Sequence, residues 1–198
     1  MSAGRIHARI GWNGREVVFR DLAADDLPRI ADYWLNTENA VLEQMGVHQA
    51  LLGDAEAIMG RFAAAIPTGD PDQPKLGFAF DVDGAMVGYT NLNRISASEN
   101  YSHWHIFDPV WRRSGLSSLL YPYRLRTYFA LTPMERLIHQ TRPENVGVNR
   151  LLDRFVPIAA TCFVEKPDGL SKPGIFNLRY VTRDDLPRIM ALATGTEF

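Results

Sequence analysis

Three strand-like runs joined by short turns occupy the middle of the chain, and they constrain the fold more than any other feature. The runs cover residues 76–81, 86–92 and 101–107, and Asp83-Gly84 stands between the first two. An Asp-Gly pair between apolar runs is typical of a β-hairpin. Strands joined in this way are antiparallel, so the pattern excludes a doubly wound nucleotide-binding fold, in which crossover helices connect the strands.

The flanking segments predict the fold class. A hairpin with Asn13-Gly14 at its turn is expected over residues 5–22. Apolar periodicity and caps then predict helices from Asp26 through Trp34 and over 55–65, a helix from about Ser114, a strand over 135–141, a helix over 146–155, and strands over 159–164 and 176–181. This order predicts an α+β (three-layer α/β) architecture with a mixed, mostly antiparallel sheet flanked by helices. We expect one domain over residues 1–198.

Two residues carry local expectations. Pro122 falls inside the helix that starts near Ser114, and it predicts a kink or an early break there. The single cysteine, Cys162, excludes an intrachain disulfide. It stands in the strand-like run from Ala159 to Glu165, where we expect it to be a buried apolar filler.

The charge distribution bears on which classes of partner the protein can bind. The formal net charge is only -2, which argues against nucleic acid as the main partner. Residues 21–83 carry 12 acidic and 3 basic side chains, whereas residues 112–154 carry 3 acidic and 8 basic ones. Such halves suit a polyanionic cofactor on one side and a cationic substrate on the other, although chance spread over a solvated surface explains them equally well.

No apolar run approaches the roughly 20 residues of a membrane-spanning helix, and the first residues lack the apolar core of a signal peptide. We therefore expect a cytoplasmic protein with no membrane partner.

The run from Phe107 to Leu120 carries the strongest chemical signal. A strand ends at Pro109, a turn of small residues follows, and a Leu-rich helix begins. Backbone N–H groups at a helix start lack internal partners and, helped by the helix dipole, can bind a phosphate. Arg112 and Arg113 add positive charge, and Gly115 leaves the backbone open to a ligand. Any strand-to-helix turn needs small residues, so spacing alone leaves a purely structural interpretation open.

This run resembles the acyl-CoA-binding signature of the GNAT (Gcn5-related N-acetyltransferase) superfamily. The signature is Pro, two residues, Arg or Gln, two residues, Gly, one residue, then Gly or Ala, and Pro109, Arg112, Gly115 and Ser117 occupy its positions. Ser117 departs from the usual Gly or Ala, and Arg113 replaces a common Gly. The resemblance implies a set of residues that contact the pantetheine thioester: Ile106, Phe107, Asp108, Arg112, Arg113, Ser114, Gly115, Leu116, Ser117 and Ser118.

A second similarity lies at the start of the helix near Val146. Relatives place an Asn there that holds the pantetheine arm or orients the thioester, and the resemblance carries this role to Asn145, with Asn149 one turn on as a further candidate. A simple helix cap explains Asn145 equally well. Leu152 occupies the position at which relatives often have a tyrosine that protonates the leaving thiolate.

Acyl transfer to an amine needs a base near the strand before the signature. Relatives often use a Glu there, and none lies between Tyr101 and Pro109. His103 and His105 are two residues apart, so in a strand they share one face, and histidine suits proton transfer near neutral pH. An inert, hydrogen-bonded pair is the alternative. No third ligand is evident nearby, so we expect no metal.

The resemblance also implies which groups stabilise the oxyanion and which contact the acceptor. A backbone N–H near Ile106 to Asp108 would hold the oxyanion of the tetrahedral intermediate. The N-terminal helices would face the acceptor, with Trp34, Glu38 and Glu43 as candidate contacts.

The sequence therefore predicts an enzyme, an N-acyltransferase that moves an acyl group, acetyl by default, from a pantetheine thioester to a primary amine by direct attack. The donor is expected to be acetyl-CoA or another acyl-CoA. Two alternatives remain open at this point: a donor bound to the phosphopantetheine of an acyl carrier protein, and a non-catalytic acyl-CoA-binding regulatory domain. The acceptor is a small-molecule or peptide amine, and both a monomer and a homodimer fit the sequence.

Overall fold

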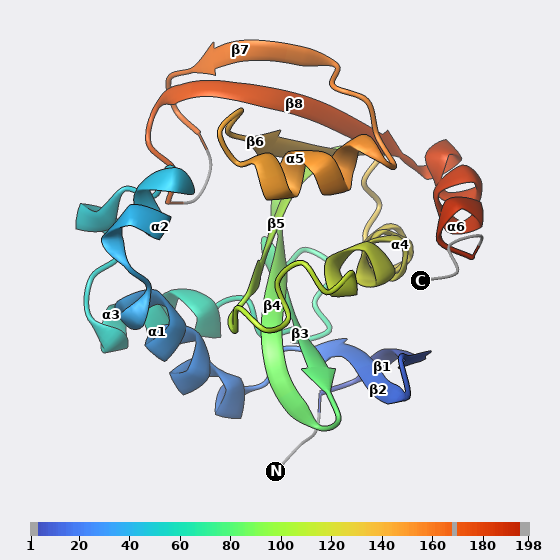
Figure 1. The fold of residues 1–198 in the computed structure, drawn as a ribbon, viewed down its shortest axis with the longest axis horizontal. Coiled ribbons are helices and arrows are strands. Elements are labelled where there is room, and N and C mark those ends of the chain that lie inside the picture. Colours follow the sequence, from blue (N-terminus) through green and yellow to red (C-terminus); the bar gives the residue numbers. More distant parts are fainter. Residues whose placement is uncertain (1–3, 168–169, 195–198) are drawn as a thin grey trace.

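The chain folds around a mixed β-sheet that extends through most of the molecule (Figure 1). The computed structural model describes residues 4–167 and 170–194. Within them the sheet has eight strands: β1 (Ile6–Trp12), β2 (Arg15–Asp21), β3 (Lys75–Val82), β4 (Ala85–Arg94), β5 (Glu99–Ile106), β6 (Arg136–Thr141), β7 (Ala160–Val164) and β8 (Gly174–Thr182). Their spatial order is β1-β2-β3-β4-β5-β6-β8-β7. Only β5 and β6 run parallel, so the predicted mixed, mostly antiparallel sheet is confirmed.

Helices cover both faces of the sheet, as the sequence predicted. They are α1 (Leu27–Asn36), α2 (Asn39–Gln44), α3 (Ala55–Ala63), α4 (Leu116–Leu131), α5 (Val146–Asp153) and α6 (Leu186–Thr194), with short 3-10 turns at Ala24–Asp26, Gln49–Leu51 and Arg183–Asp185. The first three helices gather on one side of the molecule (Figure 1) and pack there in one apolar cluster. The other three contribute to a second cluster on the opposite face.

The hairpin turns follow from local chemistry. Asn13 and Gly14 have φ values of 50° and 76°, and Asp83 and Gly84 have 49° and 80°. A two-residue turn with positive φ at both positions matches the right-handed twist of the strands that it joins, and Asn-Gly and Asp-Gly adopt it with little strain. Both predicted hairpins are therefore confirmed.

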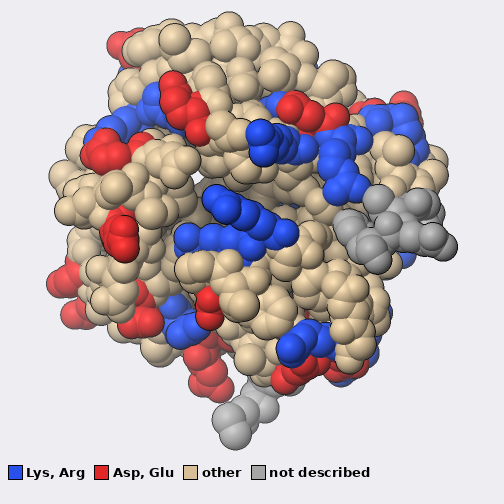
Figure 2. Space-filling model, viewed as in Figure 1, with Lys and Arg blue, Asp and Glu red and all other residues tan. Residues whose placement is uncertain are grey.

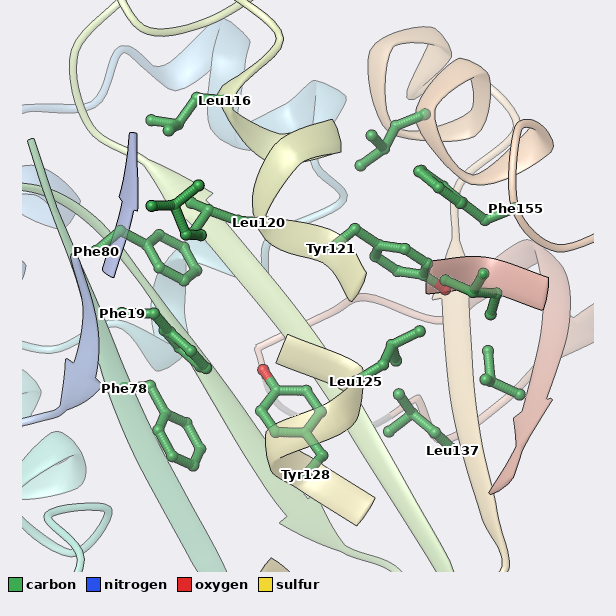
Figure 3. Close-up of a cluster of buried hydrophobic side chains, with 14 of the residues drawn as sticks. Phe19, Phe78, Phe80, Leu116, Leu120, Tyr121, Leu125, Tyr128, Leu137 and Phe155 are labelled. Carbon is green, nitrogen blue, oxygen red and sulfur yellow. The ribbon is translucent and has the colours of Figure 1, made fainter. Parts of the chain in front are cut away.

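Helix α4 supplies the centre of the larger core. Its Leu120, Leu125 and Tyr128 are at most 1% exposed, and Figure 3 shows them near phenylalanines of the sheet, among them Phe19 and Phe78. The burial of each such side chain contributes about 1.5–3 kcal/mol, so the helix is held along its length by packing.

The expected early break at Pro122 is wrong. Helix α4 is continuous over 16 residues with Pro122 inside it. A proline in a helix interior costs about 3 kcal/mol because one N–H bond is lost and the ring crowds the preceding turn. Pro122 is itself buried, as are its neighbours Leu120 and Tyr121. The combined burial outweighs the cost.

The expected burial of Cys162 is also wrong. Strand β7 lies at the edge of the sheet and pairs only with β8. Cys162 is exposed, and its neighbour Phe163 is 66% exposed. Residues 160–163 of β7 are all exposed, so the usual burial of a free cysteine does not hold at this edge of the sheet.

Candidate functional site

The site is organised by the divergence of β5 from β6. These strands pair only from Glu99–Tyr101 to Arg136–Ile138, whereas β5 continues to pair with β4 as far as Ile106. Beyond Tyr101 the edge of β5 that faces β6 therefore has no strand partner. Figure 2 shows that this face of the molecule is hollowed at its centre, with Lys and Arg side chains bordering the hollow.

Backbone N–H groups on that edge of β5 are open to a ligand. The N–H of Phe107 donates to the carbonyl oxygen of Val87 at 2.9 Å, so this N–H group points toward β4. Successive residues of a strand direct their backbone groups to opposite sides, so the N–H groups of Ile106 and Trp104 face the divergence. An extended ligand lying between the strands can bond to them as a further strand would.

A tight turn leads from β5 to α4. Ser114 Oγ donates to the carbonyl oxygen of Trp111 at 2.7 Å and accepts the N–H of Leu116 at 3.3 Å. Arg113 and Gly115 have left-handed backbones, with φ of 66° and 93°. A left-handed Arg is strained by about 1–2 kcal/mol, which explains why a glycine suits the position of Arg113. The geometry starts α4 at the open end of the divergence, where the N–H groups that follow that of Leu116 and the positive dipole are available to an anion.

Arg112 holds this turn against the end of β5. Its Nε donates to the carbonyl oxygen of Ile106 and its Nη2 to that of Phe107, both at 3.1 Å. The guanidinium is half-buried and occupied by these carbonyls. Arg112 therefore positions the turn. Arg113 is exposed, so its positive charge is available to an anion at the start of α4.

His103 and His105 lie side by side on the face of β5 that α1 covers, with ring centroids 5.4 Å apart. His105 Nδ1 is 3.2 Å from the hydroxyl of Tyr33, and its ring packs against Trp34 and stacks on Tyr89 at 5.1 Å. Burial, and then the charge of Arg124, lowers the pKa of His103 to about 4. Burial, followed by His103 and Arg112, holds the pKa of His105 well below its ordinary value. Both imidazoles are neutral at physiological pH.

An open pocket of about 430 Å³ lies between the N-terminal helices and the end of β5. It is lined by Arg29, Asp32, Tyr33, Asn36, Thr37, Glu38, Val41, Phe107, Asp108, Pro109 and Arg112. Tyr33 links the pocket to His105, because it lines the pocket and its hydroxyl approaches the imidazole. Burial raises the pKa of Tyr33, so the phenol stays protonated and able to relay a proton.

The three candidate acceptor residues fall in different places. Glu38 lines the pocket. Trp34 is 3% exposed and donates its indole N–H to the hydroxyl of Tyr89 at 2.9 Å, so it supports the aromatic group around His105 rather than the pocket wall. Glu43 forms an ion pair with Lys172 at 2.7 Å.

That ion pair is one of several contacts that join the N-terminal helices to the segment before β8. The segment after α2 pairs with the segment before β8 through a Val47–Ser171 β-bridge, and the N–H of Lys172 donates to the carbonyl oxygen of Gly46 at 2.7 Å. Arg142 Nη2 also donates to the carbonyl oxygen of Lys172 at 2.6 Å. The N-terminal helices are thereby fastened to the β6–β8 side, on the far side of the divergence from α4 (Figure 1).

Asn145 and Asn149 have different surroundings. Asn145 caps α5, with Oδ1 accepting the N–H of Val148 at 3.4 Å. Asn149 is 9% exposed; its Oδ1 accepts from Arg179 at 2.9 Å and Thr141 at 2.8 Å, and its Nδ2 donates to backbone carbonyls. Asn149 thus has its hydrogen-bonding capacity occupied within the fold, whereas Asn145 lies at the helix end.

The solved structures that this chain resembles include acetyltransferases. RimL, a ribosomal L7/L12 alpha-N-protein acetyltransferase in complex with coenzyme A, matches with a TM-score of 0.70 and 13% identity over 90% of this chain and 99% of its own. Aminoglycoside acetyltransferase AAC(6')-Ib in complex with coenzyme A matches with a TM-score of 0.67 and 15% identity, over 87% and 98%. RimJ from Mycobacterium smegmatis, in complex with CoA-disulfide, matches with a TM-score of 0.65 and 16% identity, over 96% and 92%.

The chain has the GNAT fold. No protein-family model and no curated protein sequence matches it. The resemblance found in the Pro109–Ser117 signature is therefore confirmed at the level of the fold, since the neighbours share between 13% and 16% of their residues with the chain.

Tyr33 lies in the N-terminal helices that the resemblance places on the acceptor side, and it borders the pocket and touches His105. The buried Arg124, in contrast, drew no functional expectation from the sequence. Arg124 is 1% exposed on the buried side of α4. Its spacing from Leu120, Tyr121 and Tyr128 is helical, and a charged residue on such an apolar face is a detectable signal.

Two further expectations concern absences. Over residues 4–167 and 170–194, no group of three or more His, Cys, Asp or Glu side chains is placed to hold a metal ion. No helix in the same ranges is long and apolar enough to cross a membrane.

Proposed function

We propose that this chain is an N-acyltransferase that transfers an acyl group from an acyl-CoA thioester to a primary amine. The observation that carries the proposal is the unpaired edge of β5 beyond Tyr101, which ends at the turn where α4 begins. A pantetheine arm has amide groups that can bond to that edge, and the attached pyrophosphate suits the first N–H groups of α4. The neighbours that share the fold were crystallised with coenzyme A.

The residues of the cofactor site take distinct parts in this proposal. The backbone of Gly115, Leu116, Ser117 and Ser118 holds the pyrophosphate, and Arg113 supplies charge. Arg112 and Ser114 keep the turn in shape through their bonds to the end of β5 and to Trp111. Asn145, at the start of α5, borders the arm from the opposite side.

The acceptor amine occupies the pocket beside Tyr33, with Glu38 attracting its positive charge. The neutral amine attacks the thioester carbonyl, and the N–H of Ile106 stabilises the oxyanion that forms. The new C–N bond forms first and gives a tetrahedral intermediate, and the C–S bond breaks when the carbonyl group re-forms. The proton lost by the nitrogen passes through the Tyr33 hydroxyl to His105, and the departing thiolate is protonated from solvent, because Leu152 stands where relatives have a tyrosine.

Calorimetry with acetyl-CoA, followed by a screen of primary amines for free thiol release, tests this function. We expect binding of the CoA ester and turnover of at least one amine. Tyr33→Phe and His105→Ala should lower kcat while leaving the Kd of acetyl-CoA within about threefold, because neither side chain faces the turn. Leu35→Ala, at an exposed position of the same helix α1, is the matched control for altered packing.

The alternatives give different outcomes. Binding of an acylated carrier protein without binding of acetyl-CoA would keep the chemistry and replace the donor. Tight CoA binding with no amine turned over, and no effect of His105→Ala, would favour a regulatory acyl-CoA-binding domain. Failure to bind any pantetheine thioester would refute the proposed function.

A further inference from the structure

Two arginines are fully buried, and their surroundings differ. Arg179 is 0% exposed and bonds to the carboxylate of Asp153 at 2.5 Å, to Asn149 at 2.9 Å and to the carbonyl oxygen of Val156 at 3.2 Å. Arg124 is 1% exposed, and it forms no ion pair with any Asp or Glu among the described residues. Its positive charge is therefore uncompensated by the protein.

The hydrogen bonds of Arg124 are also incomplete. Nε approaches the hydroxyl of Tyr128 and Nη2 that of Ser102, both at 3.4 Å, whereas Nη1 has no partner. The guanidinium lies 4.2 Å from the ring centroid of Trp104, which offers a cation–π contact. A guanidinium has five N–H donors, and a buried charge is costly unless it is paired. An anionic group with two oxygens would pair with the positive charge and accept hydrogen bonds from the guanidinium N–H groups that lack partners.

The position of Arg124 shows where such an anion would come from. Ser102 and Trp104 belong to the part of β5 beyond Tyr101, where β6 no longer pairs. In the proposed function the thioester carbonyl lies beside Ile106 on this edge. Trp104 is two residues away, which is about 6–7 Å along a strand. The remainder of an acyl chain, continuing past the carbonyl toward the closed end of the divergence, reaches the Trp104 ring on which the guanidinium rests.

We propose that Arg124 binds the terminal carboxylate of a short dicarboxylic acyl group, so that the donor is a carboxyacyl thioester of the malonyl or succinyl class. This inference rests on the proposed acyl transfer and specifies its donor. The carboxylate supplies the missing negative charge and accepts from Nη1, while Trp104 packs against the methylene chain. The bonds made and broken are those of the transfer itself, and the carboxylate passes unchanged to the product.

Matched pairs of donors test the inference without knowledge of the acceptor. Butyryl-CoA has the chain length of succinyl-CoA with a methyl group in place of the carboxylate, and acetyl-CoA reports on the pantetheine site alone. Calorimetry with the full chain should show succinyl-CoA binding at least about thirtyfold more tightly than butyryl-CoA, because leaving a buried charge unpaired is costly. Arg124→Met should abolish that difference and bind acetyl-CoA as the wild type does.

Two controls separate recognition from structure. Arg126→Met removes the same charge from an exposed position of the same helix, and it should keep the wild-type preference. Replacing an unpaired buried cation with an apolar side chain of similar length is often neutral or stabilising, so Arg124→Met should not lower Tm. Arg124→Lys should retain part of the preference, since it keeps the charge and loses the two-pronged contact.

The outcomes are distinct. A preference for succinyl-CoA that Arg124→Met removes, with an unchanged Tm, supports the inference. Equal binding of succinyl-CoA and butyryl-CoA by the wild type overturns it, and binding of acetyl-CoA in the same experiment leaves the proposed function standing. Binding of none of the three esters overturns both.

Discussion

A carboxylate placed in the first turn of α4 distinguishes an anion-binding turn from a merely structural one. Ser117 is the second residue of α4 and is half-buried. An aspartate near a helix N-terminus interacts favourably with the dipole, so Ser117→Asp should stabilise the free protein by about 0.3–1 kcal/mol. The same carboxylate would stand beside the pyrophosphate that the turn is proposed to hold.

The expected loss of affinity follows from the burial of Ser117. Two unit charges 4 Å apart repel by about 1 kcal/mol in water and about 4 kcal/mol at an effective dielectric constant of 20. A half-buried position lies between these limits, so we expect a cost of about 2–3 kcal/mol, or a Kd for acetyl-CoA roughly 30- to 150-fold higher.

Calorimetry with acetyl-CoA and thermal denaturation of the free protein measure both effects. Ser117→Ala should bind at least as tightly as the wild type, because the residue is then one that the GNAT signature uses at this position. Ala57→Asp adds the same charge to the first turn of α3, on the other face of the sheet, and should leave binding unchanged. Unaltered binding by Ser117→Asp would refute the placement of the pyrophosphate at α4.

Three further expectations follow from the buried polar groups and from the sheet edge. Burial lowers the pKa of His139 to about 3 and also depresses those of the two histidines of β5. Below pH 6.5 the unfolded chain therefore binds protons that the folded chain does not. Denaturant titrations should show the free energy of unfolding falling by about 2 kcal/mol from pH 7 to pH 5 for each such histidine, and falling less in His139→Phe. Asn149→Ala should lower the free energy of unfolding by about 2–4 kcal/mol, since it leaves Arg179 and other buried groups without a partner, whereas Asn145→Ala should cost about 1 kcal/mol as a lost cap; equal costs in urea titrations would contradict these roles. Cys162 should react with a thiol reagent in native buffer as fast as an exposed thiol, and reaction only in denaturant would show that the β7 edge is covered.

Much of the site follows from sequence because it is local. A helix start after a turn of small residues exposes N–H groups regardless of what lies elsewhere, so the helix start after Gly115, where we propose that an anion binds, was predictable from its neighbours. The two-residue period of a strand put His103 and His105 on one face, and their rings are 5.4 Å apart. Local chemistry also determined both hairpin turns, with Asn13 and Asp83 in left-handed conformations.

Other features depend on residues far apart in the sequence. Glu43 was expected near the acceptor, and it is paired with Lys172, 129 residues away. Tyr33 reaches His105 only because α1 packs across β5. The lowered pKa values of the histidines arise from burial that no local pattern records.

The sequence by itself determined the hairpins, the helix start at the signature and most of the element order, because each depends on backbone preferences within a few residues. The tertiary structure alone decided that Pro122 stays within a helix, that Cys162 is exposed and that Arg124 is buried with no counter-charge among residues 4–167 and 170–194. These outcomes depend on which surfaces come together, because packing and desolvation are properties of the assembled core and sheet edges rather than of any segment taken alone.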